Sequence, residues 1–405
     1  MNSVKIYKDS LSGASAAGFR ADAFHRFEEL GFPTRKLEAW KYLPLEQILN
    51  ARFALSTDAY ESMIKISGHE NLPKGVIVED LGKAIESAPE LVRPYLAAGA
   101  QNEPNAFVSI NTFAFKQGVF LYIPDGVTLS EPIHLLIGQS GGSPQPQVFY
   151  PRILVVAGEQ TSFSVIADYV GFGNEKFFSN TVAEIYLGKG AALDFLQFQR
   201  EPSEVFQFVT NRFFLKTDSS LNVRQFVRGG SVTRNENEVR FSGPRGQATL
   251  KGLSVLSGQS QVYQHAVVRH DVGDCSSRQF YKNILADQSK SEFNSLVFVE
   301  QEAKGSHSQQ LNRNLLMSDA AEAFSRPQLQ INTDDVQCTH GATVGQIEKD
   351  ELFYLRSRGL SEKEARFVLT YGFAHEFVEE IASPLLRAQM EKLVSEELKR
   401  VIHGY

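Results

Sequence analysis

The feature that most constrains the fold of this chain is a regular series of turn signals between roughly Asn105 and Ile331. Short runs rich in β-branched and aromatic residues, such as GVFLYIP, ILVVA, TVAEIYL and SLVFV, alternate with turns that contain Gly, Asp, Asn or Pro. The turns recur about every 13–17 residues, and no convincing helical pattern interrupts them. This regularity predicts a repetitive β architecture.

Two architectures produce such a pattern. One is an antiparallel meander closed into a sandwich or barrel, and the other is a flattened β-helix with two strands, or about 30 residues, in each coil. An ordinary barrel closes at roughly 8–11 strands, whereas the turns of this chain imply about 15. A solenoid accommodates any number of strands because each coil contacts only its neighbours. We therefore favour the β-helix.

The segment Glu236–Phe241 indicates how one such strand is oriented. Asn237, Val239 and Phe241 fall on one face, and the charged residues between them fall on the other. We expect the charged face to be the outer, polar one.

Helical patterns precede the β region. An apolar stripe from Phe19 to Leu30 ends at Gly31 and Pro33, which are typical of a helix C-terminus. A second helix is expected over Leu81–Ala98, interrupted or started near Pro89.

Helical patterns also follow the β region, from about Lys349 onward. Ser361 and Glu364 form a capping box, Pro384 breaks the helix that they open, and a last amphipathic helix runs over Leu385–Ile402. The expected division is an N-terminal helical region, 1–100, a β-helix core, 101–345, and a C-terminal helical domain, 346–405.

Composition and charge exclude several classes of function. Hydrophobic residues make up 42% of the chain and charged residues 22%, which is typical of a globular protein. The net charge of −6 argues against a nucleic-acid groove, which needs concentrated positive potential. No run approaches the roughly 18–20 apolar residues of a membrane span, and the N-terminus lacks the apolar core of a signal peptide, so we expect a cytoplasmic protein.

The most informative short motif is the pair Cys338 and His340 at the end of the β region. On a strand, residues i and i+2 point to one face, so thiolate and imidazole would lie side by side. Both groups suit Zn²⁺, Fe²⁺ or an iron–sulfur cluster. The alternative is a buried cysteine beside a histidine that is hydrogen-bonded to the backbone. Asp334 and Asp335, just upstream, are either outer-shell acceptors or turn residues.

This chain alone cannot hold a cluster by four thiolates. Its two cysteines, Cys275 and Cys338, form no C-x-x-C pattern. Nothing near Cys338 and His340 in the sequence completes a coordination sphere, which indicates a site finished by another chain.

Other candidate sites are weaker. His265 and His270 have an odd spacing and face opposite ways on a regular strand, and a turn separates both from Cys275. His375-Glu376 with Glu379-Glu380 is interpreted as a solvated helix face. The segment Gly188-Lys189-Gly190 lacks the spacing of a phosphate-binding loop, so any ATP use requires a partner.

Two segments some 300 residues apart resemble the SufB/SufD family of iron–sulfur cluster assembly scaffold proteins. The upstream segment matches at Arg35, Glu38, Ala39, Trp40, Lys41 and Tyr42. The downstream segment matches at Asp334, Asp335, Cys338, His340-Gly341-Ala342-Thr343 and Leu352-Phe353-Tyr354-Leu355-Arg356-Ser357-Arg358-Gly359. The resemblance spans nearly the whole chain, although the middle matches in architecture more than in letters.

Two departures favour the SufD branch of that family. SufB-like proteins carry a Gly-Asp-x-Cys segment at the last β coil, where this chain has Met317–Ala321 without a thiol. They also read His-Glu-Ala-Thr where this chain has His340-Gly341-Ala342-Thr343. The resemblance therefore implies that this subunit does not build a cluster unaided.

The resemblance implies a mostly β fold with α, in which a central right-handed parallel β-helix is flanked by helical domains. It implies a non-catalytic scaffold subunit that pairs with a SufB-like subunit through the last coils, or with itself in isolation, and that binds a SufC-like ABC-type ATPase. His340, and secondarily Cys338, would contact a transient iron–sulfur cluster shared with the partner, without a tightly bound cofactor. The ATPase would dock on the C-terminal domain, at Leu352, Phe353, Tyr354, Arg356, Arg358, Gly359 and Phe373.

Two other functions fit a β-helix. Many parallel β-helices act on polysaccharides as lyases or epimerases, although no acid cluster recurs along the expected coils as it would in such an enzyme. A purely structural solenoid that homodimerises is the other alternative.

Overall fold

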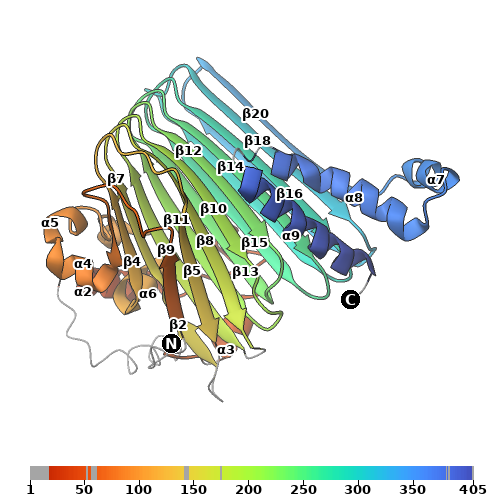
Figure 1. The fold of residues 1–405 in the computed structure, drawn as a ribbon, viewed down its shortest axis with the longest axis horizontal. Helices are drawn as coiled ribbons and strands as arrows, with labels where there is room; N and C mark the ends of the chain where they lie inside the picture. Colours follow the sequence, from red (N-terminus) through yellow and green to blue (C-terminus); the bar gives the residue numbers. More distant parts are fainter. Residues whose placement is uncertain are drawn as a thin grey trace.

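The computed structural model describes residues 18–51, 53–55, 62–140, 146–173, 176–379, 381 and 384–403. Its centre is a β-helix built from two long sheets (Figure 1). One sheet, called sheet A, contains β3 (Ile77–Asp80), β4 (Gly118–Ile123), β7 (Arg152–Ala157), β9 (Phe177–Leu187), β11 (Phe206–Leu215), β13 (Val232–Phe241), β15 (Gln261–His270), β17 (Lys290–Val299) and β19 (Glu322–Ile331), with β1 (Ala54–Leu55) and β6 (Gln147–Phe149) at its side. Sheet B contains β2 (Ser62–Ser67), β5 (Ile133–Ser140), β8 (Ser162–Phe172), β10 (Ala192–Gln199), β12 (Ser220–Val227), β14 (Gln247–Leu256), β16 (Ser276–Leu285), β18 (Ser306–Leu316) and β20 (Val336–Gln346).

The strand pairing confirms a parallel β-helix. The chain alternates between the sheets, and each strand from β8 to β20 pairs in parallel with the strand two positions away. In sheet B, Ser220 pairs with Gln247 and Gln247 pairs with Ser276, so successive coils are 27 and 29 residues long. The antiparallel barrel is therefore wrong. Antiparallel pairs occur at the N-terminal end, where β2 meets β5 and β3 meets β4.

The interior of the β-helix is apolar on one side and polar on the other. Val223, Phe195 and Phe213 belong to a continuous apolar core that joins both sheets. Further along the same strands, amide side chains replace them, and Asn211 donates to Gln197 at 3.0 Å and to Asn237 at 2.9 Å. Buried amides are tolerated there because each can bond to amides in the next coils.

For strand β13, the expectation is confirmed for the inner face and only partly for the outer face. Asn237, Val239 and Phe241 point into the interior and are buried. The outer charged residues do not all meet solvent, however: Glu236 is 7% exposed, because N-terminal segments cover that part of sheet A.

The N-terminal segments supply most of this cover. They include α2 (Phe19–Leu30), the 3₁₀ turn η1 (Glu38–Trp40), α3 (Leu45–Asn50), α4 (Leu81–Ser87), α5 (Pro89–Val92), η2 (Ala100–Asn102) and α6 (Ala106–Ala114). The helix expected to end at Gly31 is confirmed as α2, and Gly31 takes a positive φ of 62° there.

Helix α6 contradicts the expectation that no helix lies within Asn105–Ile331. All nine of its residues are buried, polar ones included, and the helix is shorter than the window of about 11–18 residues over which a helical period is recognised in a sequence. The side chain of Asn105 caps it by accepting from the backbone N–H of Phe107 at 2.9 Å.

The interruption expected near Pro89 in the helix over Leu81–Ala98 is confirmed, whereas the expected length is wrong. The helix is broken at Ala88 into α4 and α5, because Pro89 supplies no backbone N–H to continue α4 and instead begins α5. Residues after Val92 form turns.

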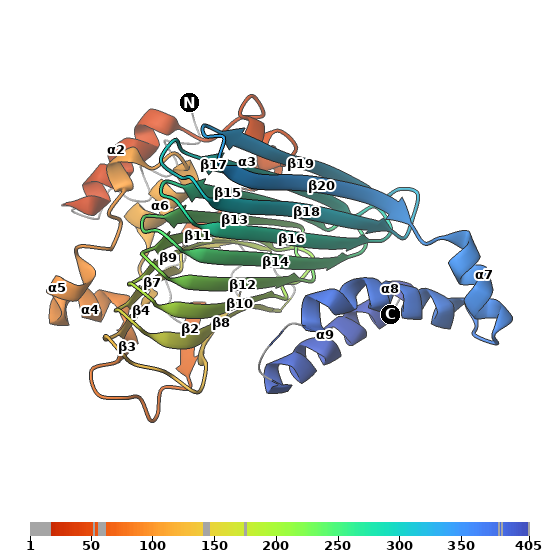
Figure 2. The same cartoon turned by 90° about the horizontal axis from the view of Figure 1, so that it is seen from above.

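Three helices follow the β-helix: α7 (Lys349–Ser357), α8 (Glu362–Glu379) and α9 (Pro384–His403). Figures 1 and 2 show α8 and α9 lying along the outer face of sheet B, with α7 standing clear of it. Phe377 and Met390 pack there against Leu253 in one apolar cluster. Among the described residues, no helix combines the length and the apolar character that crossing a membrane requires.

One acidic residue of α8 has a different role from the expected one. Glu376 is not merely solvated: it accepts from Lys282 of β16 at 2.7 Å, and Lys282 also donates to the backbone C=O of Phe373 at 2.7 Å. This pair fixes α8 to sheet B. Glu380, expected on the same face, lies outside the described residues.

Candidate functional site at the open end of the β-helix

Cys338 and His340 lie on β20, the last strand of sheet B. Cys338 pairs with Ser308 and His340 pairs with Gln310, and both of these β18 residues are buried in the interior. Because side chains alternate along a strand and paired residues face the same way, Cys338 and His340 continue the inner rows of the β-helix to its open end.

The two side chains differ in their surroundings. Cys338 is half-buried and packs against the apolar core, and burial raises the pKa of its thiol, partly offset by the backbone N–H of Ser308. His340 is exposed. The imidazole is therefore open to a ligand, whereas the thiol is less readily ionised than that of an exposed cysteine.

No third ligand lies nearby. In the part of the chain that the structure describes, no three His, Cys, Asp or Glu side chains converge on a point where a metal ion would fit. Asp334 and Asp335 are residues of the bend between β19 and β20, and the backbone C=O of Asp335 accepts from Gly305 at 2.8 Å. Within the described residues, Cys338 and His340 therefore offer at most two of the ligands that a metal site needs.

The end of the β-helix that carries these residues is uncovered. β19 and β20 are the terminal strands of their sheets, so each has an edge without a strand partner among the described residues. Apolar side chains are exposed there, at 40% for Ile331 and 51% for Val344. Such edges are a template for pairing with another chain.

His265, His270 and Cys275 do not form a site. His265 lies outside, 3.5 Å from Glu236, whereas His270 lies inside with its ring against Phe241. Burial lowers the pKa of His270 to about 4, so this ring is neutral at physiological pH. Cys275 is fully buried, which fits a packing role.

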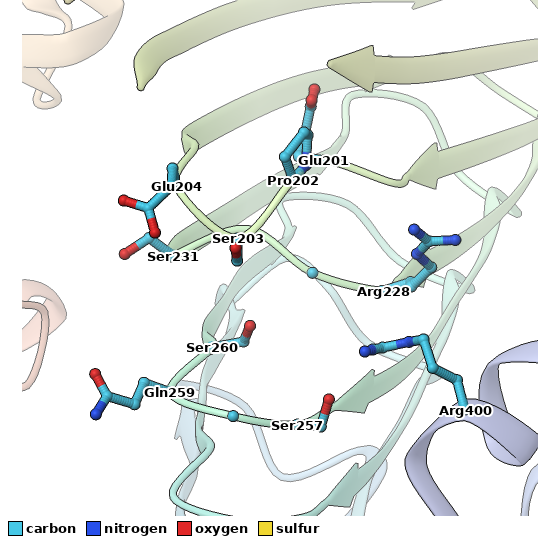
Figure 3. A pocket seen from close by; sticks show the side chains of 12 residues that line it. Glu201, Pro202, Ser203, Glu204, Arg228, Ser231, Ser257, Gln259, Ser260 and Arg400 are labelled. Atoms are coloured by element: carbon cyan, nitrogen blue, oxygen red, sulfur yellow. The ribbon is translucent and has the colours of Figure 1, made fainter. Parts of the chain in front are cut away.

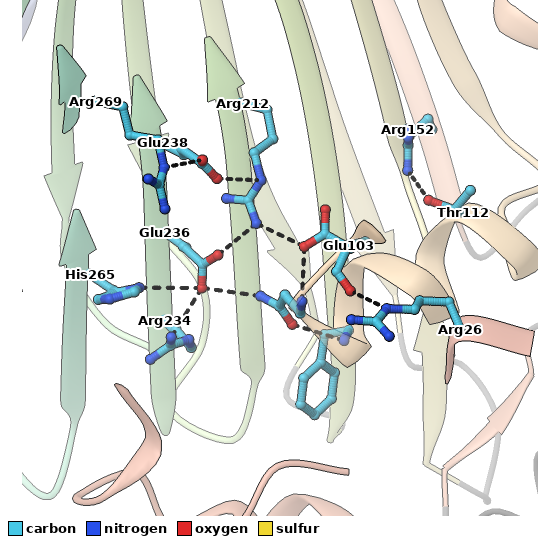
Figure 4. A network of polar contacts seen from close by, with 12 residues as sticks. Arg26, Glu103, Thr112, Arg152, Arg212, Arg234, Glu236, Glu238, His265 and Arg269 are labelled. Atoms are coloured by element: carbon cyan, nitrogen blue, oxygen red, sulfur yellow. Dashed lines mark hydrogen bonds and ion pairs between the residues drawn. The ribbon is translucent and has the colours of Figure 1, made fainter. Parts of the chain in front are cut away.

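A larger polar network, which the sequence analysis missed, lies between the N-terminal segments and the outer face of sheet A (Figure 4). Arg212 is within 3.2 Å of Glu103, 2.8 Å of Glu236 and 3.2 Å of Glu238. Arg234 is 3.0 Å from Glu236. These charged residues occupy every second position of their strands, which is also the pattern of a solvent-exposed face. The sequence therefore cannot distinguish them from surface charges, because only the N-terminal segments that cover them make the difference.

A cavity of about 410 Å³ opens where three loops of the β-helix meet α9 (Figure 3). Its walls are Glu201–Glu204, Arg228, Gly229, Ser231, Ser257–Ser260 and Arg400. Buried Glu397 lies between the two arginines, 2.7 Å from Nε of Arg400 and 3.4 Å from Nε of Arg228. The cavity is therefore part of the joint between α9 and the β-helix.

The raised pKa of Glu201, in the wall of this cavity, predicts that the stability of the protein depends on pH. Burial, together with the charge of Asp168, raises its pKa from 4.5 to about 8. Between these values the folded protein keeps a proton that the unfolded chain releases, so the group lowers the unfolding free energy as pH rises from about 4.5 to about 8. In Glu201→Gln the loss should be smaller, because the amide cannot ionise and can still accept from Gln207. Urea midpoints measured at about pH 5 and about pH 8.5 test this; equal shifts for both proteins would contradict it.

The residues expected to bind an ATPase divide into two groups. Phe353 and Tyr354 of α7 are exposed by 74% and 56%, and Arg358 lies 5.3 Å from the Tyr354 ring. Leu352, Arg356 and Gly359 belong to the same projecting segment. Phe373 lies elsewhere: it packs against sheet B, with Nζ of Lys282 4.7 Å from its ring.

An apolar groove continues from this segment onto α8. It has a volume of about 360 Å³ and is lined by Leu360, Glu364, Phe367, Val368 and Lys399. Val368 is 46% exposed. The groove lies where α8 meets α9, and its residues Leu360, Phe367 and Val368 make it largely apolar.

Comparisons with known proteins give a consistent answer over almost the whole chain. The family model for the SUF system FeS cluster assembly, SufBD core domain, matches residues 138–373, and the model for the SufBD protein N-terminal region matches residues 5–68 and 58–135. The iron–sulfur cluster assembly protein SufD of Escherichia coli is 27% identical over 383 residues, which cover 91% of this chain and 90% of that protein. An iron–sulfur cluster assembly SufBD family protein of Synechocystis is 28% identical over 340 residues, covering 82% and 74%. SufD of Bacillus subtilis is 24% identical, covering 80% and 75%.

Proposed function

This chain belongs to the SufBD family of the SUF iron–sulfur cluster assembly system, and we propose that it is a SufD-type, non-catalytic scaffold subunit of that system. In this role it pairs with a SufB-like subunit, binds an ABC-type ATPase of the SufC type, and helps to form nascent clusters. The clusters are its cargo, so no tightly bound cofactor is part of the proposal.

The observation that carries the proposal is the open end of the β-helix. β20 is 11 residues long and its outer edge has no strand partner in the described structure, although natural proteins usually protect long edges. A partner with the same β-helical architecture would continue both sheets and cover Ile331 and Val344. The same edge would serve a homodimer when this subunit is isolated.

At that interface His340 is the first candidate ligand. Its neutral imidazole can bind iron, and its exposure at the open end allows a partner to supply further ligands. Cys338 ranks below it because burial raises the pKa of its thiol, so a metal ion must compete with the proton. Both cysteines are free.

The projecting helix α7 is the proposed ATPase-docking element. Exposed aromatic side chains such as Phe353 and Tyr354 are typical anchors of protein interfaces. The chain contains no phosphate-binding loop, so ATP hydrolysis belongs to the partner. Movement of the ATPase would reach the β-helix through α8, which Glu376 ties to Lys282.

Co-expression with a SufB-like subunit and a SufC-like ATPase tests this function. A tagged chain should retain both partners, and Phe353→Ala should lose ATPase capture by roughly tenfold or more while keeping the SufB-like subunit, since an exposed anchor contributes to binding and little to folding. Phe172→Ala is the matched control, because this phenylalanine is 43% exposed on β8. A wild-type chain that captures neither partner would contradict the function, and equal ATPase capture by both variants would contradict the docking site.

A further inference from the structure

The segment around Trp40, which resembles the family motif, makes structural contacts that the proposed function does not explain. We call residues 37–42 the strap. Trp40 is 7% exposed and anchors it: the ring lies 5.3 Å from Phe107, and the Arg234 guanidinium lies 3.9 Å from its centre. Arg234 also donates to the backbone C=O of Ala39 at 2.9 Å. The strap is therefore held on β13, within the charged network of Figure 4.

The far side of the strap reaches β19. The Tyr42 ring stacks on Phe324 of that strand, with 4.6 Å between ring centres and 15° between the planes. Glu38 forms an ion pair with Arg326 of β19, and the Arg326 guanidinium lies 5.7 Å from the Tyr42 ring. Tyr263 of β15 donates to the backbone C=O of Tyr42 at 3.0 Å. One short segment thus connects β13, β15 and the terminal strand of sheet A.

Among the described residues, a gap beside these contacts limits what else can join the N-terminal segments to β19 here. Directly beyond Tyr42, a cavity of about 350 Å³ separates Pro44 and Gln47 from Phe324 and its neighbours. Within the described structure, β19 bonds to β17 on one side and has no strand partner on the other. Terminal strands with few contacts open most easily, so added contacts on an outer face reduce that opening.

We propose that the strap is a positioning element for the open end: Glu38 and Tyr42 hold β19 in the geometry in which a second subunit meets it. The hold on β19 follows from contacts within this chain, and its effect on pairing rests on the function proposed above. Trp40 serves as the anchor, and Glu38 and Tyr42 act on the edge strand. The strap makes no contact with cargo, and its role is to order the surface that the partner recognises.

Hydrogen exchange of the isolated protein tests the first half of the proposal. In Tyr42→Ala and in Glu38→Gln, amides of residues 322–331 that donate to β17 should exchange roughly two- to tenfold faster, which is the fold-change expected from the loss of one aromatic stack or charged contact. Amides of β13 should be unchanged. Leu37→Ala is the matched control, because Leu37 lies in the strap with 54% of its surface exposed. Unchanged exchange of residues 322–331 in both variants would overturn the proposal.

A charge exchange separates a specific contact from general loosening. Glu38→Arg alone should accelerate exchange in β19, and combination with Arg326→Glu should restore it, because the pair is re-formed with opposite polarity. If exchange in β19 stays fast in the double variant and Tyr42→Ala leaves that exchange unchanged, the strap does not hold β19.

The pairing half is measured as the dissociation constant for a SufB-like subunit. Tyr42→Ala should weaken pairing by about twofold or more, because the measured dissociation constant is the intrinsic one divided by the fraction of molecules whose β19 holds the binding geometry, and loss of the stack lowers that fraction in a terminal strand that opens easily. Faster exchange with unchanged pairing would overturn the positioning role. Absence of pairing by the wild type, with the exchange result intact, would instead count against the proposed function.

Discussion

Replacing His340 with alanine is expected to lower the iron and acid-labile sulfide of the co-expressed complex by roughly tenfold or more, with the complex itself intact. The side chain is exposed on the terminal strand, so its removal should change the unfolding free energy by no more than about 0.5 kcal/mol. Loss of cluster content from a complex of normal composition would therefore report ligation. The measurement is iron and sulfide per complex after anaerobic purification.

Two further variants make this result specific. His307→Ala removes an exposed histidine one coil away on β18, on the outer face of the sheet, and should leave the cluster content unchanged. Cys338→Ala should have a smaller effect than His340→Ala, because the raised pKa of the thiol favours its protonated form. Equal cluster content in wild type and His340→Ala would reduce this chain to an architectural partner, as in the alternative of a structural solenoid.

Replacing Arg212 with methionine is expected to destabilise the protein by about 3–5 kcal/mol, the usual cost of removing one partner from a buried ion pair. Arg212 is 8% exposed and lies among Glu103, Glu236 and Glu238, so its loss leaves the buried Glu103 carboxylate without a cation and removes one of the cations that face Glu236. Chemical denaturation followed by circular dichroism measures the difference. Arg240→Met is the control: its ion pair with Asp271 is 54% exposed on the arginine side, and its loss should cost no more than about 1 kcal/mol.

The same network predicts an acid limit to stability. Burial alone would raise the pKa of Glu236, but Arg212, His265 and Arg234 hold it well below its ordinary value of 4.5. The stabilisation from this carboxylate is therefore present above about pH 4.5 and is lost as the pH falls through the lower folded value. Arg212→Met should lose less stability than the wild type on acidification, because the first of the cations that lower the pKa of Glu236 is gone while Arg234 and His265 remain. Parallel acid curves for the two proteins would contradict the assigned role of Arg212.

Much of the fold could be predicted because the signals are local. Turns about every 13–17 residues implied two strands per coil, and the coils of 27 and 29 residues agree. The period of two along a strand predicted that Cys338 and His340 face the same way, and it placed Asn237, Val239 and Phe241 on the inner face of β13. The helix of Phe19–Leu30 followed from its apolar stripe and its glycine stop.

The misses share a different physical origin. Helix α6 is only nine residues long and buried on all sides, so too few residues are available to show a helical period and none of them faces solvent. Glu376 was interpreted as a solvated surface residue because its partner, Lys282, is 94 residues away. The strap residues were recognised only as a family-like motif, since their contacts with β13 and β19 span more than 190 residues.

The sequence by itself therefore determined the length of each coil and the inner and outer faces of its strands. It also determined that the thiol of Cys338 and the imidazole of His340 lie on the same face of the last strand. These features depend on spacings of two to about 30 residues, which follow from the geometry of strands and coils and not from contacts between distant segments. Only the tertiary structure decided which charged side chains are buried and which are exposed to solvent. Glu236 and Arg240 belong to the same outer face of one strand, yet the first lies under N-terminal segments and the second is exposed, because burial depends on what covers a face and not on the face itself.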